Sequence, residues 1–169
     1  MNESVYYNSP LGILQIRSLG NSISELSFVN RQGSVKIKDD EAVFVKPASA
    51  AIKKCIKQLN QYFAGKLFDF DLNLQQEGTP FQQSVWSELV KIRYGCTESY
   101  LSLSKRIGNT KAIRAVGTAN GRNNIAIIVP CHRVIGSNGS LVGYGGDLWR
   151  KKWLLEHEAK YANGVQTLF

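Results

Sequence analysis

The 169-residue chain is long enough for one ordinary domain or two small ones, and its composition, 43% hydrophobic without low-complexity tracts, excludes a disordered or fibrous protein. The N-terminus lacks a signal-peptide pattern and no apolar run approaches membrane-spanning length, which predicts a cytoplasmic protein with no membrane partner, associated with the nucleoid if prokaryotic. The net charge is +8, and residues 79–169 hold 12 Lys and Arg against 5 Asp and Glu, which leaves open a nucleic-acid partner or simply a solvated basic surface.

The first 77 residues predict a small α+β domain with a structural role. Strands are expected at residues 4–9, 12–19 and 22–29, separated by Pro-Leu-Gly and Gly-Asn turn signals, with a fourth at 35–38. Apolar residues at helical spacing predict a helix over 48–63, and Cys55 lies on its apolar stripe, which predicts a core position. Alternating residues at 68–74 predict a further strand.

Residues 75–78 are the expected boundary, so that residues 78–169 form the second domain. Thr79 and Pro80 predict a helix start, and the helix is expected to end at residues 94–96. Ser99 predicts the cap of a short helix that Gly108 closes, and Asn109 predicts the cap of another over 110–119. Two short helices joined at a glycine are typical of a helix-turn-helix, although many helical pairs share this pattern.

The helix over 110–119 combines small and basic side chains. Ala112, Ala115 and Gly117 are small, whereas Lys111 and Arg114 are basic. Small side chains let a helix approach a DNA groove closely, and basic ones meet phosphate or reach into the base stack. A helix packed tightly in the core would use small residues equally well, so the pattern leaves both interpretations open.

A Pro-Cys-His turn follows the apolar run at 125–129, which predicts a buried strand. A free thiol has a pKa near ~8.5, so Cys131 needs a base such as His132 to become a nucleophile at neutral pH. Alternatively, Cys131 is a small buried hydrophobe and His132 an ordinary loop residue. The three cysteines are an odd number without metal-ligand spacing, which argues against a disulfide scaffold or a zinc site.

Residues 136–140 predict a turn, and four glycines within 139–146 predict a mobile loop where backbone approaches a ligand, or a plain flexible connection. The last helix is expected over 147–161, with Asp147 complementing its N-terminal dipole. Its predicted apolar anchors are Leu148, Trp149, Trp153, Leu154 and Leu155.

At this point the second half resembles the O6-alkylguanine-DNA alkyltransferase family, the methylated-DNA–protein-cysteine methyltransferases. The match runs from about residue 79 to 159 and includes that family's signature, Pro130-Cys131-His132-Arg133-Val134. Further matching motifs are Ser99-Tyr100, Arg114-Ala115-Val116-Gly117, Asn123, Tyr144 and Trp153-Leu154-Leu155-Glu156-His157-Glu158. The resemblance implies an RNase H-like sheet and helix, then a mostly helical, winged helix-turn-helix-like domain for DNA binding and alkyl transfer.

The resemblance also implies a reaction and the residues that perform it. The family moves an alkyl group, mainly methyl, from guanine O6 onto the cysteine, once per molecule. Activity of this chain on O4-methylthymine stays open. The base must first leave the duplex stack. Carried over, Cys131 is the acceptor, Glu158 and His132 relay its proton through water, and Asn123 holds the cysteine turn.

Other matched positions imply a base pocket and a DNA surface. Tyr100 would donate to the base, Val134 would offer it a backbone carbonyl, and Tyr144 and Gly145 would form a wall. Arg114 would fill the gap left by the flipped nucleotide. The small side chains of Ala112, Ala115 and Gly117 would let its helix enter the groove, and Ser137 would be a further DNA contact. The expected partner is double-stranded DNA containing O6-alkylguanine.

Departures from the family pattern concern the loop and groove. Gly145 stands where alanine or serine is usual, Asp147 replaces a frequent glycine, and Ile113 is larger than the alanine of some members. The zinc ligands of some animal members have no counterparts, so we expect neither a metal nor another cofactor. We expect a monomer without an obligate protein partner, and cooperative binding along DNA stays open.

Three rival functions remain to be separated from alkyl transfer. Alkyltransferase-like proteins bind the lesion but lack the cysteine, which Cys131 argues against. A Cys-His hydrolase or acyl transferase would turn over repeatedly without DNA. A regulator that senses alkylation would need a further domain, for which the chain has little room.

Overall fold

The computed structural model describes residues 2–31, 33–144 and 147–163, and the chain divides into two compact units. The first unit comprises residues 1–77 together with Asn124–Ala126, and the second comprises residues 78–123 and 127–169. The sequence had suggested a single division near residue 77, so the return of residues 124–126 to the first unit is a feature that only the structure reveals.

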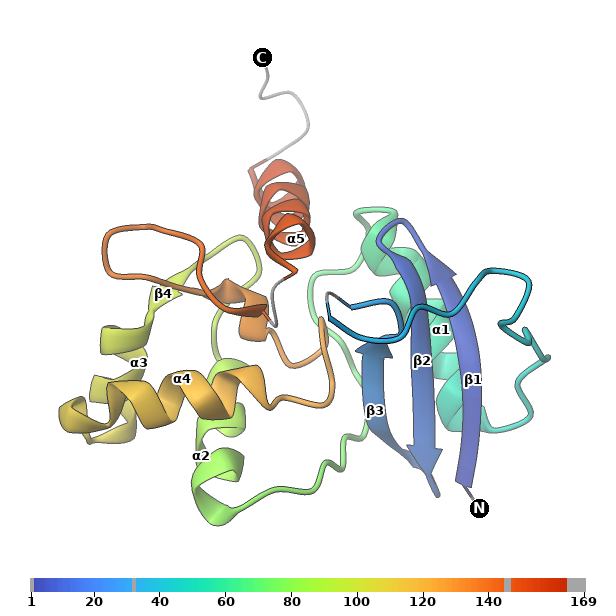
Figure 1. Ribbon diagram of the computed structural model, residues 1–169, viewed down its shortest axis with the longest axis horizontal. Helices are drawn as coiled ribbons and strands as arrows, with labels where there is room; N and C mark the ends of the chain where they lie inside the picture. Colours follow the sequence, from blue (N-terminus) through green and yellow to red (C-terminus); the bar gives the residue numbers. More distant parts are fainter. Residues whose placement is uncertain (1, 32, 145–146, 164–169) are drawn as a thin grey trace. The chain divides into compact units, whose positions relative to one another are not determined.

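The first unit is a three-stranded antiparallel sheet with one helix against it (Figure 1). β1 (Asn2–Ser9), β2 (Gly12–Leu19) and β3 (Ser22–Phe28) follow one another in space, and α1 (Ala50–Phe63) packs on all three strands. The side chain of Ser49 caps α1 by accepting a hydrogen bond from the Ile52 N–H. Cys55 is fully buried on this helix, which confirms its predicted core position, and burial raises the pKa of its thiol to about 12.

The outer edge of β3 pairs with two short segments that the sequence had predicted as strands. Leu74 forms a single parallel bridge with Ile23, and Ile125 forms another with Leu26. Full strands over 68–74 and 125–129 were therefore wrong predictions. The run at 125–129 is largely buried, whereas Phe68 and Leu74 of the other segment are exposed, and neither apolar pattern reflects continuous pairing.

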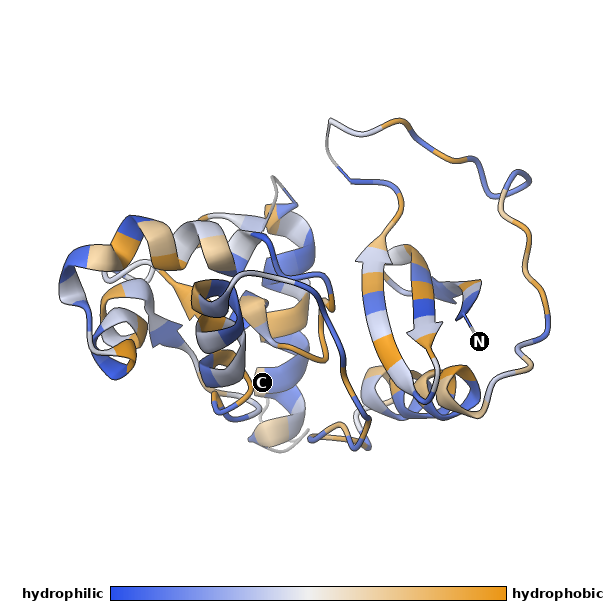
Figure 2. Ribbon diagram, turned by 90° about the horizontal axis from the view of Figure 1, so that it is seen from below, coloured by the Kyte–Doolittle hydropathy of each residue, from blue (hydrophilic) through white to orange (hydrophobic). Residues whose placement is uncertain are grey.

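The predicted strand at 35–38 was also wrong. The connection from β3 to α1 is a long loop without a helix or strand among its described residues (Figure 2). Val35 is almost fully exposed, so it has no apolar surface to pair against. The Asn30 side chain instead holds the backbone of Ile37 through two hydrogen bonds, of 2.6 and 2.8 Å.

The second unit is mostly helical. α2 (Pro80–Leu89), α3 (Tyr100–Ile107) and α4 (Ile113–Gly121) pack against one another, and the buried Trp86 indole donates to the Ala119 carbonyl at 2.9 Å. α2 begins in a capping box at Thr79, as its sequence predicts, but it already ends at Leu89. Gly108 ends α3 with a left-handed φ of 88°, and the predicted helix over 110–119 begins as a 3-10 turn, η1 (Thr110–Ala112).

The rest of the second unit brings distant segments together around a short parallel pair of strands. β4 (Glu98–Ser99) pairs with β5 (Val134–Ile135), which directly follows the 3-10 turn η2 (Cys131–Arg133). α5 (Leu148–Ala162) packs against η2. Leu148 and Trp149 are exposed on α5, so these two predicted anchors were wrong, whereas Leu154 is buried. No helix in the described part of the chain combines the length and the apolar character needed to cross a membrane.

Candidate active site around Cys131

Cys131 opens the η2 turn and keeps 7% of its surface exposed. Its N–H donates to the Val129 carbonyl at 2.8 Å, and the Asn123 amide donates to the same carbonyl at 2.8 Å. The Asn120 amide donates to the carbonyl of Cys131 itself at 3.3 Å. Two asparagines from the end of α4 and the segment after it therefore hold the backbone of the cysteine turn.

The turn before Cys131 contains a strained residue. Ile127 has a φ of 71°, in a region that β-branched residues rarely adopt, and its side chain is buried. Such strain costs on the order of 1–3 kcal/mol and persists only where surrounding contacts impose it. The chain on both sides of Ile127 is anchored, by β3 at residues 124–126 and by Asn123 at Val129, which accounts for that conformation.

His132 is completely buried beside the cysteine. Its Nε2 lies 2.8 Å from Oε2 of Glu158, and its Nδ1 is buried without a hydrogen-bond partner among the described residues. With Glu158 ionised, Nε2 carries the proton and donates it to the carboxylate, which leaves Nδ1 as an acceptor. Burial lowers the pKa of His132, and the Arg133 and Lys151 charges lower it further, while Glu158 opposes them. The imidazole is therefore a neutral base at pH 7.

Glu158 is held in its ionised state by two neighbours. Arg133 donates from Nε to Oε1 at 2.8 Å and from Nη2 to Oε2 at 3.1 Å, in a two-pronged pair. Burial alone would raise the pKa of this carboxyl, but hydrogen bonds and positive charge from His132 and Arg133 more than offset it, and the pKa is lowered. His132 is neutral before reaction and then carries no positive charge. In that state, the pKa of Glu158 is lowered by Arg133 and by the hydrogen bond from the imidazole N–H.

Tyr100 begins α3 and is half-buried near the cysteine. Burial raises the pKa of its hydroxyl, as does the negative charge that Cys131 acquires on ionisation, with an opposing contribution from Asn120. The hydroxyl lies 3.4 Å from the carbonyl of Val142. A Cβ at Gly143, where φ is 82°, would lie 3.1 Å from this hydroxyl, so the glycine allows the loop to approach Tyr100 closely.

Lys151 joins two sides of this region. Its fully buried ammonium donates to the Val134 carbonyl at 2.5 Å and to the Val142 carbonyl at 2.7 Å. It also lies 5.9 Å from the centre of the Tyr100 ring. Burial lowers the pKa of Lys151 to about 8. The Val134 carbonyl that the resemblance assigns to the base edge thus already accepts a hydrogen bond from Lys151.

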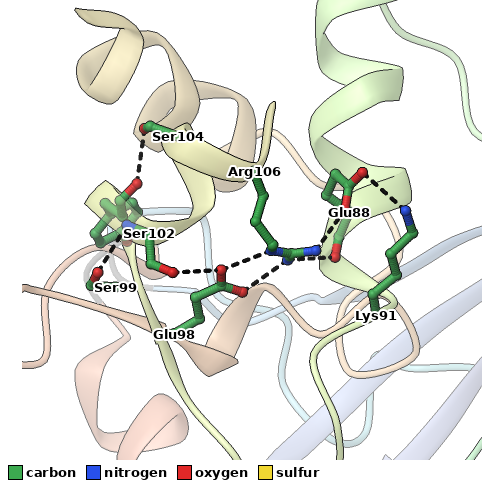
Figure 3. A network of polar contacts seen from close by, with 8 residues as sticks. Glu88, Lys91, Glu98, Ser99, Ser102, Ser104 and Arg106 are labelled. Atoms are coloured by element: carbon green, nitrogen blue, oxygen red, sulfur yellow. Dashed lines mark hydrogen bonds and ion pairs between the residues drawn. The ribbon is translucent and has the colours of Figure 1, made fainter. Parts of the chain in front are cut away.

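A surface network braces the elements that carry Tyr100 (Figure 3). Arg106 of α3 donates to both oxygens of Glu98 in β4, at 2.8 Å each, and to a carboxylate oxygen of Glu88 in α2 at 2.6 Å. The side chain of Ser102 also donates to Glu98, at 2.9 Å. These contacts tie α2, β4 and α3 together from the solvent side.

The residues assigned to DNA contact lie outside this cluster. Arg114 and Ala115 are exposed on α4, Ala112 and Gly117 are half-exposed, and Ser137 is exposed in the turn after β5. Tyr144 is nearly buried with a positive φ of 63°. Gly145 lies outside the described residues. The structure thus gathers Cys131, His132, Glu158, Asn123, Tyr100 and Val134 through shared contacts, while no such contact joins Arg114 or Ser137 to them.

Most of the chain matches family models, in two consecutive parts. Residues 4–76 match the ribonuclease-like domain of 6-O-methylguanine DNA methyltransferase, and residues 80–160 match its DNA binding domain. The chain belongs to the 6-O-methylguanine DNA methyltransferase family. Family membership confirms the resemblance seen in the sequence, the α+β fold class and the assignment to the methylated-DNA–protein-cysteine methyltransferases, which bind and repair DNA.

Relatives match this methyltransferase over nearly their full length. A methylated-DNA–protein-cysteine methyltransferase of Mycobacterium tuberculosis is 44% identical over 96% of this chain and 95% of its own, and one of Methanosarcina acetivorans is 44% identical over 90% and 95%. The crystal structure of the M. tuberculosis O6-methylguanine methyltransferase aligns with a TM-score of 0.81 at 43% identity, covering 95% and 94% of the chains. The structure of M. tuberculosis OGT in complex with DNA aligns with a TM-score of 0.79 at 43% identity, covering 92% of each chain.

Three residues of this site were missed in the sequence. Arg133 lies inside the family signature, but nothing in the sequence indicates that it donates two hydrogen bonds to Glu158. Lys151 stands seven residues before Glu158 and three before Leu154, on the same buried side of α5, and this helical spacing was a usable signal. Asn120 had no signal, because its role depends on the fold of the turn. Among the described residues, no group of three or more Cys, His, Asp and Glu side chains is arranged to hold a metal ion.

Proposed function

We propose that this methyltransferase takes the alkyl group of O6-alkylguanine in double-stranded DNA onto the sulfur of Cys131, once per molecule. One observation supports this above all: the buried Nδ1 of His132, the residue that follows Cys131, is available as an acceptor, and Glu158 lies 2.8 Å from the opposite ring nitrogen. A base of this kind, oriented by a third group, is what a cysteine nucleophile requires.

The chemistry then follows from the donors and acceptors around the sulfur. His132 accepts the thiol proton, through a water where the distance requires one, and Glu158 stabilises the imidazolium. The sulfur attacks the alkyl carbon, so that an S–C bond forms while the bond from that carbon to guanine O6 breaks. The proton returns from the relay to the leaving guanine, and Tyr100 supports it as a donor to the base. A thioether is stable, so the transfer ends with the protein alkylated.

Access to the base requires that the nucleotide leave the helix. We assign Arg114 to the gap in the stack, and α4 to the groove. The alternative interpretation, that small residues of α4 serve core packing, is weakened at two positions. Ala115 is exposed, and a Cβ added at Gly117 would meet the Tyr100 ring only at an ordinary contact distance of 3.8 Å. Packing within the protein therefore does not require a small residue at position 115 or 117. Close approach of α4 to DNA would require small residues at both.

Surface charge supports the same partner. Three of the twelve cations in residues 79–169, namely Arg133, Arg150 and Lys151, are buried, as are two of the five anions, Asp147 and Glu158. The exposed excess therefore remains strongly positive and suits a phosphate backbone. Val134, Tyr144 and Gly145 would line the base pocket, with Ser137 touching the DNA backbone. The first unit is assigned a structural role, and the protein acts as a monomer without a metal or obligate partner.

Intact-mass spectrometry tests this function. The protein is incubated with a duplex containing a single O6-methylguanine, and wild type is expected to gain one methyl group. The Cys131→Ala variant should gain none. Cys96→Ala is the matched control, because Cys96 is an exposed cysteine of the same unit, and it should react like wild type. Tight binding of the duplex without any gain in mass would point instead to a lesion-binding protein that performs no transfer.

A further inference from the structure

We propose that Arg133 is a positioning residue of the proton relay: by engaging both oxygens of Glu158, it fixes the carboxylate toward His132 and keeps that imidazole neutral before reaction. The role of Arg133 in alkyl transfer rests on the function proposed above. Its effect on the reactivity of the Cys131 thiol does not, and can be measured without DNA.

The geometry around Glu158 leaves the carboxylate little freedom. It accepts a hydrogen bond from His132 at 2.8 Å and two from Arg133 at 2.8 and 3.1 Å. Arg133 is itself anchored, because its Nη1 donates to the Ile92 carbonyl at 2.6 Å and its guanidinium lies 5.7 Å from the centre of the Tyr94 ring. A rotation of Glu158 away from the imidazole would therefore break the fork of a buried arginine.

The charges around His132 come from three segments. Glu158 and Lys151 face it from α5, Cys131 and Arg133 flank it in η2, and Tyr94, with Tyr161 beside it, lies close to Glu158. A lone buried carboxylate beside an imidazole would favour the imidazolium. Arg133 compensates that negative charge, so the imidazole keeps a free nitrogen at neutral pH. The direction of the His132 pKa, which is lowered by burial and by the Arg133 charge, agrees with this arrangement.

The same compensation acts on the cysteine. Ionisation of Cys131 with proton uptake by His132 leaves a thiolate, an imidazolium, a carboxylate and a guanidinium in one buried cluster, with the Lys151 ammonium and the Tyr100 hydroxyl close to the thiolate. Removing the guanidinium raises the affinity of the whole cluster for protons, whichever group holds them. Cys131 then needs a higher pH to react, and the displacement should be on the order of one pH unit.

The experiment measures the pH dependence of Cys131 alkylation by iodoacetamide, read at that peptide by mass spectrometry. Arg133→Gln removes the charge but keeps hydrogen-bonding groups, and Arg133→Lys keeps the charge but loses the fork. Arg133→Gln should move the pH of half-maximal reactivity upward by about one unit. In Arg133→Lys, the pH of half-maximal reactivity should stay near the wild-type value, but Cys131 should react more slowly at every pH. The pH profile of methyl transfer from a duplex should change in the same way in each variant.

Arg106→Gln is the matched control, because Arg106 also bridges carboxylates but lies on the surface (Figure 3), and it should not move the pH profile. An Arg133→Gln protein with a wild-type profile, or one scaled down equally at all pH values, would overturn the proposal. If wild type fails to take a methyl group from DNA, the proposed function fails, yet the iodoacetamide profile still decides the role of Arg133.

A second measurement avoids the risk that a variant does not fold. The chain has only two histidines, His132 and His157, so an NMR titration of labelled wild-type protein resolves both. His132 should remain neutral at pH values where an ordinary histidine, with a pKa near ~6.5, is already protonated. Protonation of His132 at or above that value would also overturn the proposal.

Discussion

Two of the clusters in the second unit in which an arginine binds a carboxylate, those of Arg133 and Arg106, differ in burial. In one, Arg133 forks onto Glu158, whose side chain is 1% exposed. In the other, Arg106 binds Glu98 and Glu88 with its own side chain 33% exposed (Figure 3). The shortest contacts are similar, at 2.8 Å in the buried cluster and 2.6–2.8 Å at the surface.

Burial, rather than geometry, separates their consequences. A broken surface pair is replaced by water, and such pairs stabilise a protein by about 0–1 kcal/mol. A broken buried pair leaves an uncompensated charge and costs about 3–5 kcal/mol. Only the buried cluster also contacts a histidine beside the cysteine. The surface cluster therefore braces elements, while the buried cluster controls charge, and the following predictions test that distinction.

The largest effect is expected for Glu158→Gln. The substitution keeps the shape of the side chain but leaves Arg133 buried without its carboxylate, so the free energy of unfolding should fall by about 3–5 kcal/mol in a denaturant titration. Methyl transfer should slow by roughly 10²-fold or more, because the imidazolium loses its partner. Binding of the duplex should be unaffected at temperatures where the variant is folded. A transfer rate within a factor of two of wild type would remove Glu158 from the relay.

The same variant makes a prediction about pH. The pKa of Glu158 is lowered in the folded state, below an unfolded value near 4.5. Its contribution to stability is therefore present above pH 4.5 and is lost as the pH falls from there toward the folded pKa. Wild type should lose stability in that acid range, and Glu158→Gln should show a shallower decline. Equal slopes would mean that other carboxyl groups account for acid unfolding.

Lys151 provides a second test of the difference between buried and exposed charges. Lys151→Met removes the donor from two carbonyls, of Val134 and Val142, and should lower the free energy of unfolding at pH 7 by about 1–3 kcal/mol. The folded pKa is lowered to about 8 from 10.5, so the unfolded state binds more protons between these values, and wild-type stability should rise from pH 8 to 10.5. Lys151→Met should lack that rise.

The neighbouring lysine provides the control for this prediction. Lys152 is exposed and lies 3.8 Å from Glu156, in a pair of the kind that stabilises little. Lys152→Met should retain both the stability at pH 7 and the rise above pH 8. If both variants behave alike, the alkaline dependence does not originate at Lys151.

The sequence predicted these elements unevenly, and particular residues show why. Capping residues at Thr79 and Ser99 placed two helix starts correctly, because caps depend on local hydrogen bonds. The strand predicted at 125–129 failed because burial of this run comes from distant segments. Ile125 bridges β3 of the first unit, and Ile127 adopts a positive φ. Neither feature has a local signal.

The site shows the same division between local and distant information. Cys131 and His132 are adjacent in the chain, and their pairing with Glu158 entered through the family motif rather than through spacing. Arg133 and Lys151 escaped notice because charged residues are usually solvated, and only the fold shows that these two are buried. The assignments of Arg114, Tyr144 and Ser137 to DNA or base contact are still predictions.

Arg114 extends the comparison to an arginine that lies exposed on α4. Arg114→Ala should leave the free energy of unfolding within about 0.5 kcal/mol of wild type, as is usual for surface substitutions. Transfer from a duplex should slow by about 10-fold to 100-fold, because the flipped state loses the side chain that fills its gap. Transfer from the free base O6-benzylguanine needs no flipping and should be nearly unchanged. Equal losses on both substrates would contradict the assignment of Arg114 to the base stack.

The smallest effect is expected for the surface cluster itself. Arg106→Gln removes the contacts to Glu98 and Glu88, but water replaces them, so the free energy of unfolding should fall by no more than about 1 kcal/mol, and less at high salt. Transfer from the free base should keep its wild-type rate and pH dependence, since the ion pairs of Arg106 lie on the surface and are made to Glu98 and Glu88 rather than to Glu158. A loss comparable to that of Glu158→Gln would show that bracing of β4 and α3 matters as much as the buried charge, and the distinction drawn from burial would fail.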